Sequence, residues 1–88
     1  MTSLKNKRWY YFDWDEYNVE KVWQHGVAPE EAEQCFFNPY NIRPHPKKRY
    51  KDRYIIRGNT NGGRKLFVVF QDLKNNIARI ITAYQTED

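Results

Sequence analysis

Residues 66–70, Leu-Phe-Val-Val-Phe, form the longest uninterrupted apolar run of the chain. Neighbouring side chains of a strand point to opposite sides, so a run that is apolar at every position favours a strand buried on both faces. We therefore expect helices to cover one face of this strand and something else to cover part of the other.

Two further β-like runs, about residues 49–57 and 77–84, flank the strand that contains this run, which extends over about residues 64–71. Glycine- and asparagine-rich residues 58–63 form one connection, and residues 72–76 form the other. Short connections of this composition join antiparallel neighbours. The second half of the sequence therefore predicts a three-stranded antiparallel meander.

The first half predicts a strand followed by a helix. Residues 8–14 are rich in aromatic side chains without helical spacing, which favours an opening strand. Asp13 with Glu16 has the form of a capping signal, with Asp15 as the competing cap, and apolar residues then recur at helical spacing. We expect a helix over about residues 16–25.

A second helix is predicted to begin at Pro29. Gly26 fits the left-handed position that ends the preceding helix, and proline is favoured in the first turn of a helix. Asn38-Pro39 closes the second helix, because the residue before a proline is excluded from the helical region. Its apolar face comprises Ala32, Cys35 and Phe36.

Residues 41–48 hold two prolines around His45, which predicts a loop or an irregular edge strand. A chain of 88 residues has room for one hydrophobic core. We therefore expect a single domain, residues 1–88, of the α+β class. Its order is an N-terminal strand, two helices and a three-stranded meander that the first strand is able to join.

The net charge of +4 conceals two segments of opposite sign. Residues 13–33 hold seven acids against one base, and residues 43–57 hold seven bases against one acid. One interpretation is that the two segments are solvated faces that attract each other. We favour nucleic-acid binding by the basic segment, because its bases alternate with tyrosines 40, 50 and 54. The expected RNA-binding residues are Lys47, Lys48, Arg49, Lys51 and Arg53.

Several classes of function lack their residues. Cys35 is the only cysteine, which excludes an intrachain disulfide and a zinc site of several thiolates, and we expect it in the core. Neither histidine has a companion at metal-ligand spacing, so we predict no metal and no cofactor. The apolar run is far shorter than the roughly 18 residues that span a bilayer, and the start of the chain lacks the order of a signal peptide, so we expect a cytoplasmic protein.

Cleavage of RNA is compatible with these residues. Attack of a ribose 2′-hydroxyl on the adjacent phosphate needs proton removal, charge stabilisation and protonation of the leaving oxygen. Arg57, Arg64 and Arg79 lie on or next to the meander strands, and we expect them to converge on one exposed patch. The register that would place them on one face is not determined by the sequence, and the alternative is that each is an ordinary solvent-facing residue.

His25 and Tyr84 are the candidates for proton exchange. His25 ends the first predicted helix, where a helix terminus favours its protonated form, and a buried ring that locks the following turn is the alternative. Tyr84 ends the last predicted strand, where a functional residue and an aromatic cap on the core are both plausible. His45 is interpreted as a solvated loop residue.

Most of the chain resembles the BrnT family of toxins from bacterial toxin–antitoxin pairs. The resemblance begins with residues 12–27, which hold Trp14-Asp15 and His25-Gly26-Val27, and continues through residues 29–33. Residues 56–58, 63–70 and 79–83 resemble the rest of the family pattern in the same order. The resemblance implies a RelE-like fold, a metal-independent endoribonuclease, and neutralisation by a DNA-binding antitoxin that represses its own operon.

The arginines at 57, 64 and 79 and the histidine at 25 match positions where the family usually shows such residues. At position 84 the family usually has an arginine, and this chain has Tyr84, a residue type that some RelE-like ribonucleases use near their C-terminus. The expected partners are RNA and the cognate antitoxin, in a homodimer or a toxin–antitoxin hetero-oligomer. The alternative function is a non-catalytic module that holds nucleic acid or an acidic protein on the same surface.

Overall fold

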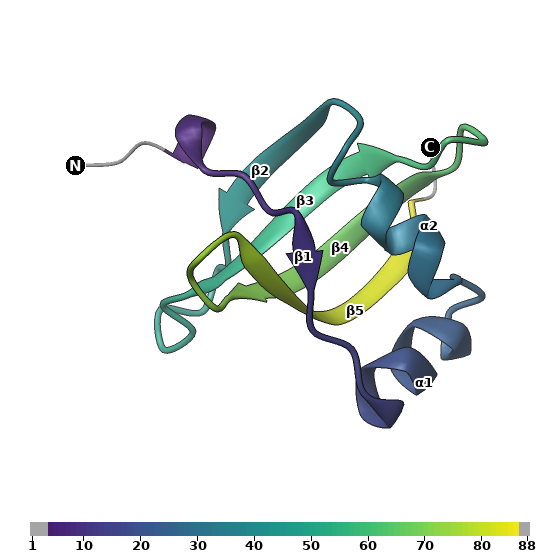
Figure 1. The fold of residues 1–88 in the computed structure, drawn as a ribbon, viewed down its shortest axis with the longest axis horizontal. Coiled ribbons are helices and arrows are strands. Elements are labelled where there is room, and N and C mark those ends of the chain that lie inside the picture. Colours follow the sequence, from purple (N-terminus) through teal and green to yellow (C-terminus); the bar gives the residue numbers. More distant parts are fainter. Residues whose placement is uncertain (1–3, 87–88) are drawn as a thin grey trace.

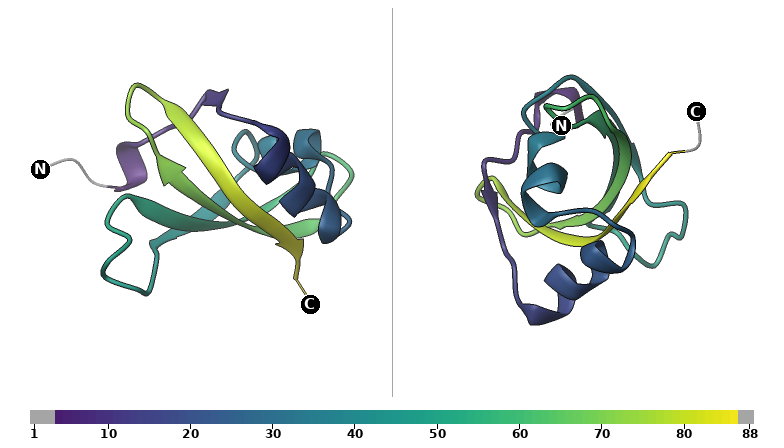
Figure 2. Two further views of the ribbon diagram at one scale, coloured as in Figure 1. Left: turned by 90° about the horizontal axis from the view of Figure 1, so that it is seen from below. Right: turned by 90° about the vertical axis from the view of Figure 1, so that its right-hand side faces the viewer.

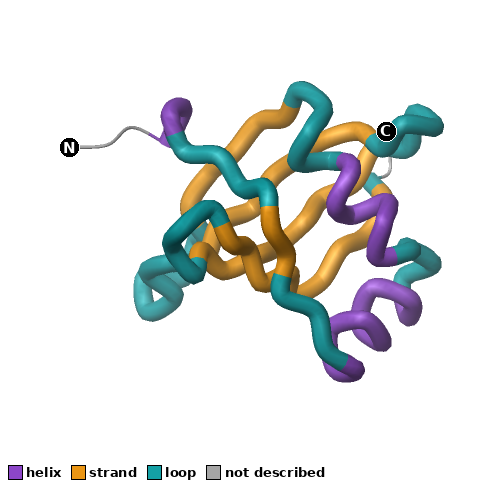
Figure 3. The backbone as a smooth tube through the Cα atoms, viewed as in Figure 1, coloured by secondary structure: helices purple, strands orange, loops and turns teal. Residues whose placement is uncertain are grey.

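A computed structural model describes residues 4–86, so residues 1–3 and 87–88 of the predicted domain lie outside the described residues. The fold consists of two α-helices and a five-stranded sheet (Figures 1 and 3). Along the chain, one strand comes before the helices and four follow them. In chain order the elements are η1 (Leu4–Asn6), β1 (Tyr11–Phe12), α1 (Glu16–Gln24), α2 (Pro29–Gln34), β2 (Tyr40–Pro44), β3 (Arg53–Asn59), β4 (Lys65–Asp72) and β5 (Ile77–Gln85).

The sheet has the order β1-β5-β4-β3-β2, with β1 parallel to β5 and the other pairs antiparallel. The α+β class is therefore confirmed, but the sheet is larger than the predicted three-stranded meander. Residues 40–44 form a regular edge strand that ends at Pro44, so the missing amide of this proline interrupts no interior ladder. The opening strand joins the sheet at the other edge.

The predicted ends of the first helix are confirmed, because capping residues determine them. The first helix begins at Glu16, and Asp15 is its cap rather than Asp13. Gly26 has a φ of 70°, the left-handed conformation expected after a helix end. The opening strand is shorter than predicted, with two residues, and β3 begins at Arg53 because residues 48–52 form turns.

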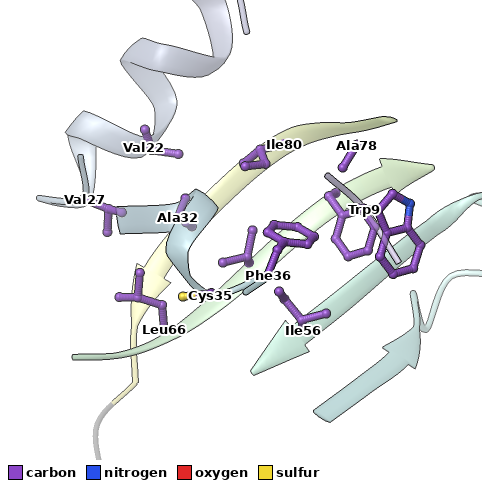
Figure 4. Packing of buried hydrophobic residues seen from close by; sticks show 13 residues of the cluster. Trp9, Val22, Val27, Ala32, Cys35, Phe36, Ile56, Leu66, Ala78 and Ile80 are labelled. Atoms are coloured by element: carbon purple, nitrogen blue, oxygen red, sulfur yellow. The ribbon is translucent and has the colours of Figure 1, made fainter. Parts of the chain in front are cut away.

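Aromatic rings fill the space between the helices and the sheet. Figure 4 shows Trp9 and Phe36 in this cluster. Their ring centroids lie 4.7 Å and 4.9 Å from that of Phe70 on β4. Tyr40 and Tyr54 pack against the same cluster from β2 and β3. These two tyrosines therefore support the core. The prediction that they alternate with bases at an RNA-binding surface is wrong for Tyr40 and Tyr54.

The sheet curls around α2, whereas α1 lies outside this curl, along β5 (Figure 2). On the side of α2, Leu66, Val68 and Phe70 of β4 are fully buried, whereas Phe67 and Val69 point to the other side and are half-buried. The expected helical cover of one face is confirmed. Within residues 4–86, no helix covers β3 and β4 on the side opposite α2, and we call this side of the sheet the open face. No helix in the described part of the chain is long and apolar enough to cross a membrane.

A buried asparagine joins α1 to the sheet. The side-chain amide of Asn18 donates hydrogen bonds to the backbone carbonyls of Asp13, at 2.9 Å, and Ile80, at 2.8 Å. Its side-chain oxygen accepts from the backbone amide of Asp15 at 2.7 Å. Asn18 is 1% exposed, its side-chain amide uses both N–H donors and its oxygen, and the start of α1 is thus held on β5.

Replacing Asn18 with alanine should lower the free energy of unfolding by about 2–3 kcal/mol, because the buried carbonyl of Ile80 and the part-buried carbonyl of Asp13 lose their donor and the helix cap loses its reciprocal bond. Urea unfolding followed by circular dichroism measures this change. Asn6→Ala is the matched control at an exposed asparagine, with an expected change of less than about 0.5 kcal/mol. Equal midpoints for Asn18→Ala and the wild type would contradict the assigned role.

Candidate functional site

The open face carries three rows of side chains that run across the central strands. Strand pairing places Arg57 beside Phe67 and Phe67 beside Tyr84 at one end of the face. The β3–β4 pairing is regular, whereas the β4–β5 pairing shifts between Val69 and Phe70, and alternate residues of β4 add two further rows. The middle row is Ile55, Val69 and Thr82, and the row at the other end is Arg53, Gln71 and Arg79.

The first row continues beyond the sheet to His25. The ring centroids of Phe67 and Tyr84 are 5.6 Å apart, and those of Tyr84 and His25 are 6.0 Å apart. On the other side of Phe67, the Arg57 guanidinium lies 6.0 Å from its ring centroid. His25, Tyr84, Phe67 and Arg57 therefore form one line of contacts, which we call the aromatic row.

Three of the five predicted catalytic candidates lie in the aromatic row. Arg57 is exposed, and the side chain of Tyr84 is 39% exposed, so Tyr84 is not a cap on the core. His25 is also exposed, which excludes the alternative of a buried ring. Phe67 connects these groups. The sequence did not indicate it as a functional residue, because a run that is apolar at every position predicts a strand buried on both faces.

Arg64 lies on the helix-covered side, next to the aromatic row rather than in it. Its guanidinium donates to a carboxylate oxygen of Glu31 at 2.7 Å and to the backbone carbonyl of Gly26 at 3.1 Å. Two more hydrogen bonds, of 3.1 Å and 2.9 Å, reach the side-chain oxygen of Gln85. Gly26 and Gln85 are the residues that follow His25 and Tyr84, so Arg64 ties together the two segments that carry them.

Arg79 is bound to the start of α1. Its guanidinium contacts carboxylate oxygens of Asp13 at 3.2 Å and Asp15 at 2.9 Å. The backbone amide of Asn18 contributes most to holding the pKa of Asp15 below its usual value, and Arg79 adds to this effect. The expected convergence of Arg57, Arg64 and Arg79 on one exposed patch is therefore not found, because carboxylates of the acidic segment hold two of them.

Residues 45–52, which we call the basic loop, project to the side of the sheet opposite α2 (Figure 2). Tyr50 organises this loop: the Arg53 and Arg49 guanidinium groups lie 4.2 Å and 5.0 Å from its ring centroid, and the His45 ring lies 5.0 Å away. A hydrogen bond from Arg49, aided by the nearby positive charges, lowers the pKa of Tyr50. Lys47, Lys48 and Lys51 are exposed around this centre.

The interpretation that the acidic and basic segments attract each other within the fold is partly correct. Within residues 4–86, ion pairs of the acidic segment reach Arg64 and Arg79, while Asp52 in the basic segment pairs with Lys74 at 3.5 Å. The lysines of the basic loop thus contribute positive charge beside the open face.

Two other predictions concern cysteine and metal ions. Cys35 is fully buried, and burial raises the pKa of its thiol to about 12, as expected for a core residue. The described residues contain no group of three or more His, Cys, Asp or Glu side chains arranged to hold a metal ion.

A comparison with protein families matches residues 14–88 to the ribonuclease toxin BrnT of type II toxin–antitoxin systems. The chain belongs to the BrnT family. This match includes every residue of the aromatic row and of the basic loop. No curated protein and no solved structure matched the chain. Membership of the BrnT family implies RNA as substrate and an antitoxin as partner.

The Arg64–Glu31 ion pair of this BrnT chain should make stability depend on pH. A backbone amide at Ala28 and the Arg64 guanidinium lower the pKa of Glu31, so their contribution is present above the usual value of 4.5 and is lost as pH falls through the lowered value. Arg64→Gln should cost about 0.5–1 kcal/mol at pH 7 and less at pH 3, measured by urea unfolding.

Glu31→Gln is the matched control, because its amide oxygen can still accept the Ala28 backbone bond. In this background Arg64→Gln should cost less than in the wild type at pH 7. An identical cost at pH 3 and pH 7 would show that the charge of Glu31 does not contribute.

Proposed function

We propose that this protein is a metal-independent endoribonuclease whose active site is the aromatic row of the open face. The observation that carries the proposal is the line of contacts from His25 through Tyr84 and Phe67 to Arg57. It brings a base, an acid and a phosphate-binding group to one exposed surface. Family membership independently supports ribonuclease activity.

The reaction is attack of a ribose 2′-hydroxyl on its adjacent phosphorus. An imidazole can accept the 2′-hydroxyl proton near neutral pH, and a phenol carries a proton that it can donate. In the arrangement we favour, His25 accepts that proton as the O2′–P bond forms, and Tyr84 protonates the O5′ leaving group as the P–O5′ bond breaks. The products are a 2′,3′-cyclic phosphate and a 5′-hydroxyl.

Arg57 is assigned to the phosphoryl oxygens, on which negative charge increases in the transition state. A guanidinium offers two parallel donors in a fixed plane and stays charged throughout the reaction. Phe67 supports this group from the adjacent strand, with the guanidinium 6.0 Å from the ring centroid. Removal of such a charge-stabilising donor typically costs about 100- to 1000-fold in rate.

Arg64 and Arg79 enter the proposal as positioning residues. Arg64 contacts the residues that follow His25 and Tyr84, so it helps to maintain the distance between these two rings. Arg79 holds the start of α1, whose other end carries His25. Both effects act through the backbone of the segments that bear the reacting groups.

The basic loop is proposed to bind the RNA backbone beside the active site. Arg53, at the loop end of β3, is four residues from Arg57, which is about 13 Å along an extended strand. A single strand of RNA can cover this separation. Lys47, Lys48, Arg49 and Lys51 then contact phosphates that are not cleaved.

The finer details of partner and fold are also proposed from the family. We infer a RelE-like arrangement, a cytoplasmic location and a DNA-binding antitoxin that neutralises the toxin in a hetero-oligomer. A homodimer is the other assembly expected from the sequence.

Purified protein should cleave single-stranded RNA in the presence of EDTA, leaving 2′,3′-cyclic phosphate ends. Arg57→Gln and Tyr84→Phe should each reduce kcat/KM by about 100-fold or more, because each removes a group that acts on the reacting phosphate. Denaturing gels and mass spectrometry of the products measure both effects.

Tyr17→Phe is the matched control, since Tyr17 is an exposed tyrosine on α1. Replacement of the 2′-hydroxyl by hydrogen at the cleaved position should abolish the reaction. Intact RNA at high protein concentration, together with tight RNA binding, would instead identify the non-catalytic binding module.

The basic loop should control the salt dependence of RNA binding. The triple variant Lys47→Gln, Lys48→Gln, Lys51→Gln loses three cations and should reduce the slope of log K against log salt by about 2, from roughly 0.7 per phosphate contact on single strands. Fluorescence anisotropy at several salt concentrations measures the slope. Lys21→Gln, on α1, should leave it unchanged, and an unaltered slope in the triple variant would exclude the loop from the interface.

A further inference from the structure

We propose that Phe67 is the surface on which a base of single-stranded RNA stacks, between Arg57 and Tyr84. This inference rests on the proposed RNA binding by the open face and does not require cleavage. It assigns a function to a residue that sequence analysis interpreted as part of a buried strand.

Phe67 is an aromatic side chain on the face that lacks a helical cover. The alternating residues Leu66 and Val68 are fully buried on the side of the sheet that carries α2, whereas Phe67 is only half-buried. Phenylalanine on an open sheet face contributes nothing to the core on the other side. Flat aromatic groups displayed on a sheet are a common platform for unstacked bases.

The neighbours of Phe67 in the sheet are flat groups as well. Tyr84 lies beside it with an interplanar angle of 41°, and the Arg57 guanidinium lies on its other side. Phenol rings and guanidinium planes both stack on bases. Three flat groups side by side thus offer a continuous surface for a base and its neighbour.

A hollow of about 270 Å³ adjoins Phe67 on this face. Phe67, Ile42 and Ile55 provide its apolar lining, and the polar members are Asn41, Arg43 and Arg57. A base fits such a lining, because its faces are apolar while its edges and its phosphate seek hydrogen bonds. The amide of Asn41 is suited to a base edge, and the two guanidinium groups are suited to phosphate.

The composition of the rim favours RNA over a protein segment as the occupant. Two arginines border the hollow, and the basic loop adds further cations to the same side of the sheet. A single strand is required, because the bases of a duplex are stacked on one another and cannot reach Phe67.

The test uses a short single-stranded RNA that carries 2-aminopurine and is methylated on every 2′-hydroxyl, so that it cannot be cleaved. Phe67→Leu keeps an apolar side chain but removes the ring, and it should weaken binding by about 5- to 150-fold. Phe67→Tyr keeps the ring and should bind within about twofold of the wild type. Phe37→Leu is the matched control, at a 59% exposed phenylalanine that packs beside Tyr10 and Phe12.

A second measurement uses the wild-type protein, so that it does not depend on the folding of a variant. RNA with 4-thiouridine should crosslink to the tryptic peptide of residues 66–74, in which Phe67 is the half-buried aromatic residue and Phe70 is fully buried. Crosslinks confined to other peptides would overturn the proposal. Thermal melts establish whether Phe67→Leu is folded before its affinity is interpreted.

The two proposals fail in different ways. If ordinary RNA is cleaved but folded Phe67→Leu binds as tightly as the wild type, the stacking proposal is wrong and the ribonuclease proposal stands. If ordinary RNA is bound but not cleaved, and Phe67→Leu loses affinity, the ribonuclease proposal is wrong and stacking stands. If an acidic peptide but no RNA binds this face, both are wrong.

Discussion

The structure depends on one packing constraint: the short helix α2 fills the curl of a five-stranded sheet, while α1 packs outside the curl along β5 and leaves the outer side of β3 and β4 without a helix. Phe36, Trp9 and Phe70 fill the covered side, and the fully buried residues of β4 alternate with half-buried ones that point away. Within residues 4–86 there is no further α-helix to cover the other side. A face with apolar residues in the middle and cations at its edges therefore remains available for a ligand.

The acidic segment, residues 13–33, and the basic segment, residues 43–57, have different roles in the fold. Asp13, Asp15 and Glu31 hold arginines that come from β5 and from the turn before β4, and these pairs fasten the helical segment to the sheet. Because exposed ion pairs contribute little free energy, their effect is more on the placement of α1 and α2 than on stability. The basic loop keeps its lysines at the surface, where the charge can attract an anionic polymer.

Sequence analysis predicted the elements whose signals are local. Asp15, Gly26 and Pro29 determine where α1 and α2 begin or end, and each acts on backbone groups within a few residues. It did not predict β2 as a regular strand, because Pro44 argues against a ladder unless the strand is known to lie at an edge. It also placed the start of β3 too early, since turns within residues 48–52 precede Arg53.

The candidate site was harder to predict, because the register of strand pairing decides which side chains become neighbours. Whether Arg57 meets Tyr84 depends on the pairing of β3, β4 and β5, and on a bulge near Ile81 that shifts the residues of β5 by one position. Without that irregularity, Tyr84 and Ile80 could not both have the orientations they have, one toward the open face and one in the core. Arginine count and spacing carry no information about such a shift. The same bulge lets Arg79 and Tyr84, which are five residues apart, face the same side, but Arg79 lies in the row of Gln71, where it reaches the acids before α1 instead of the aromatic row.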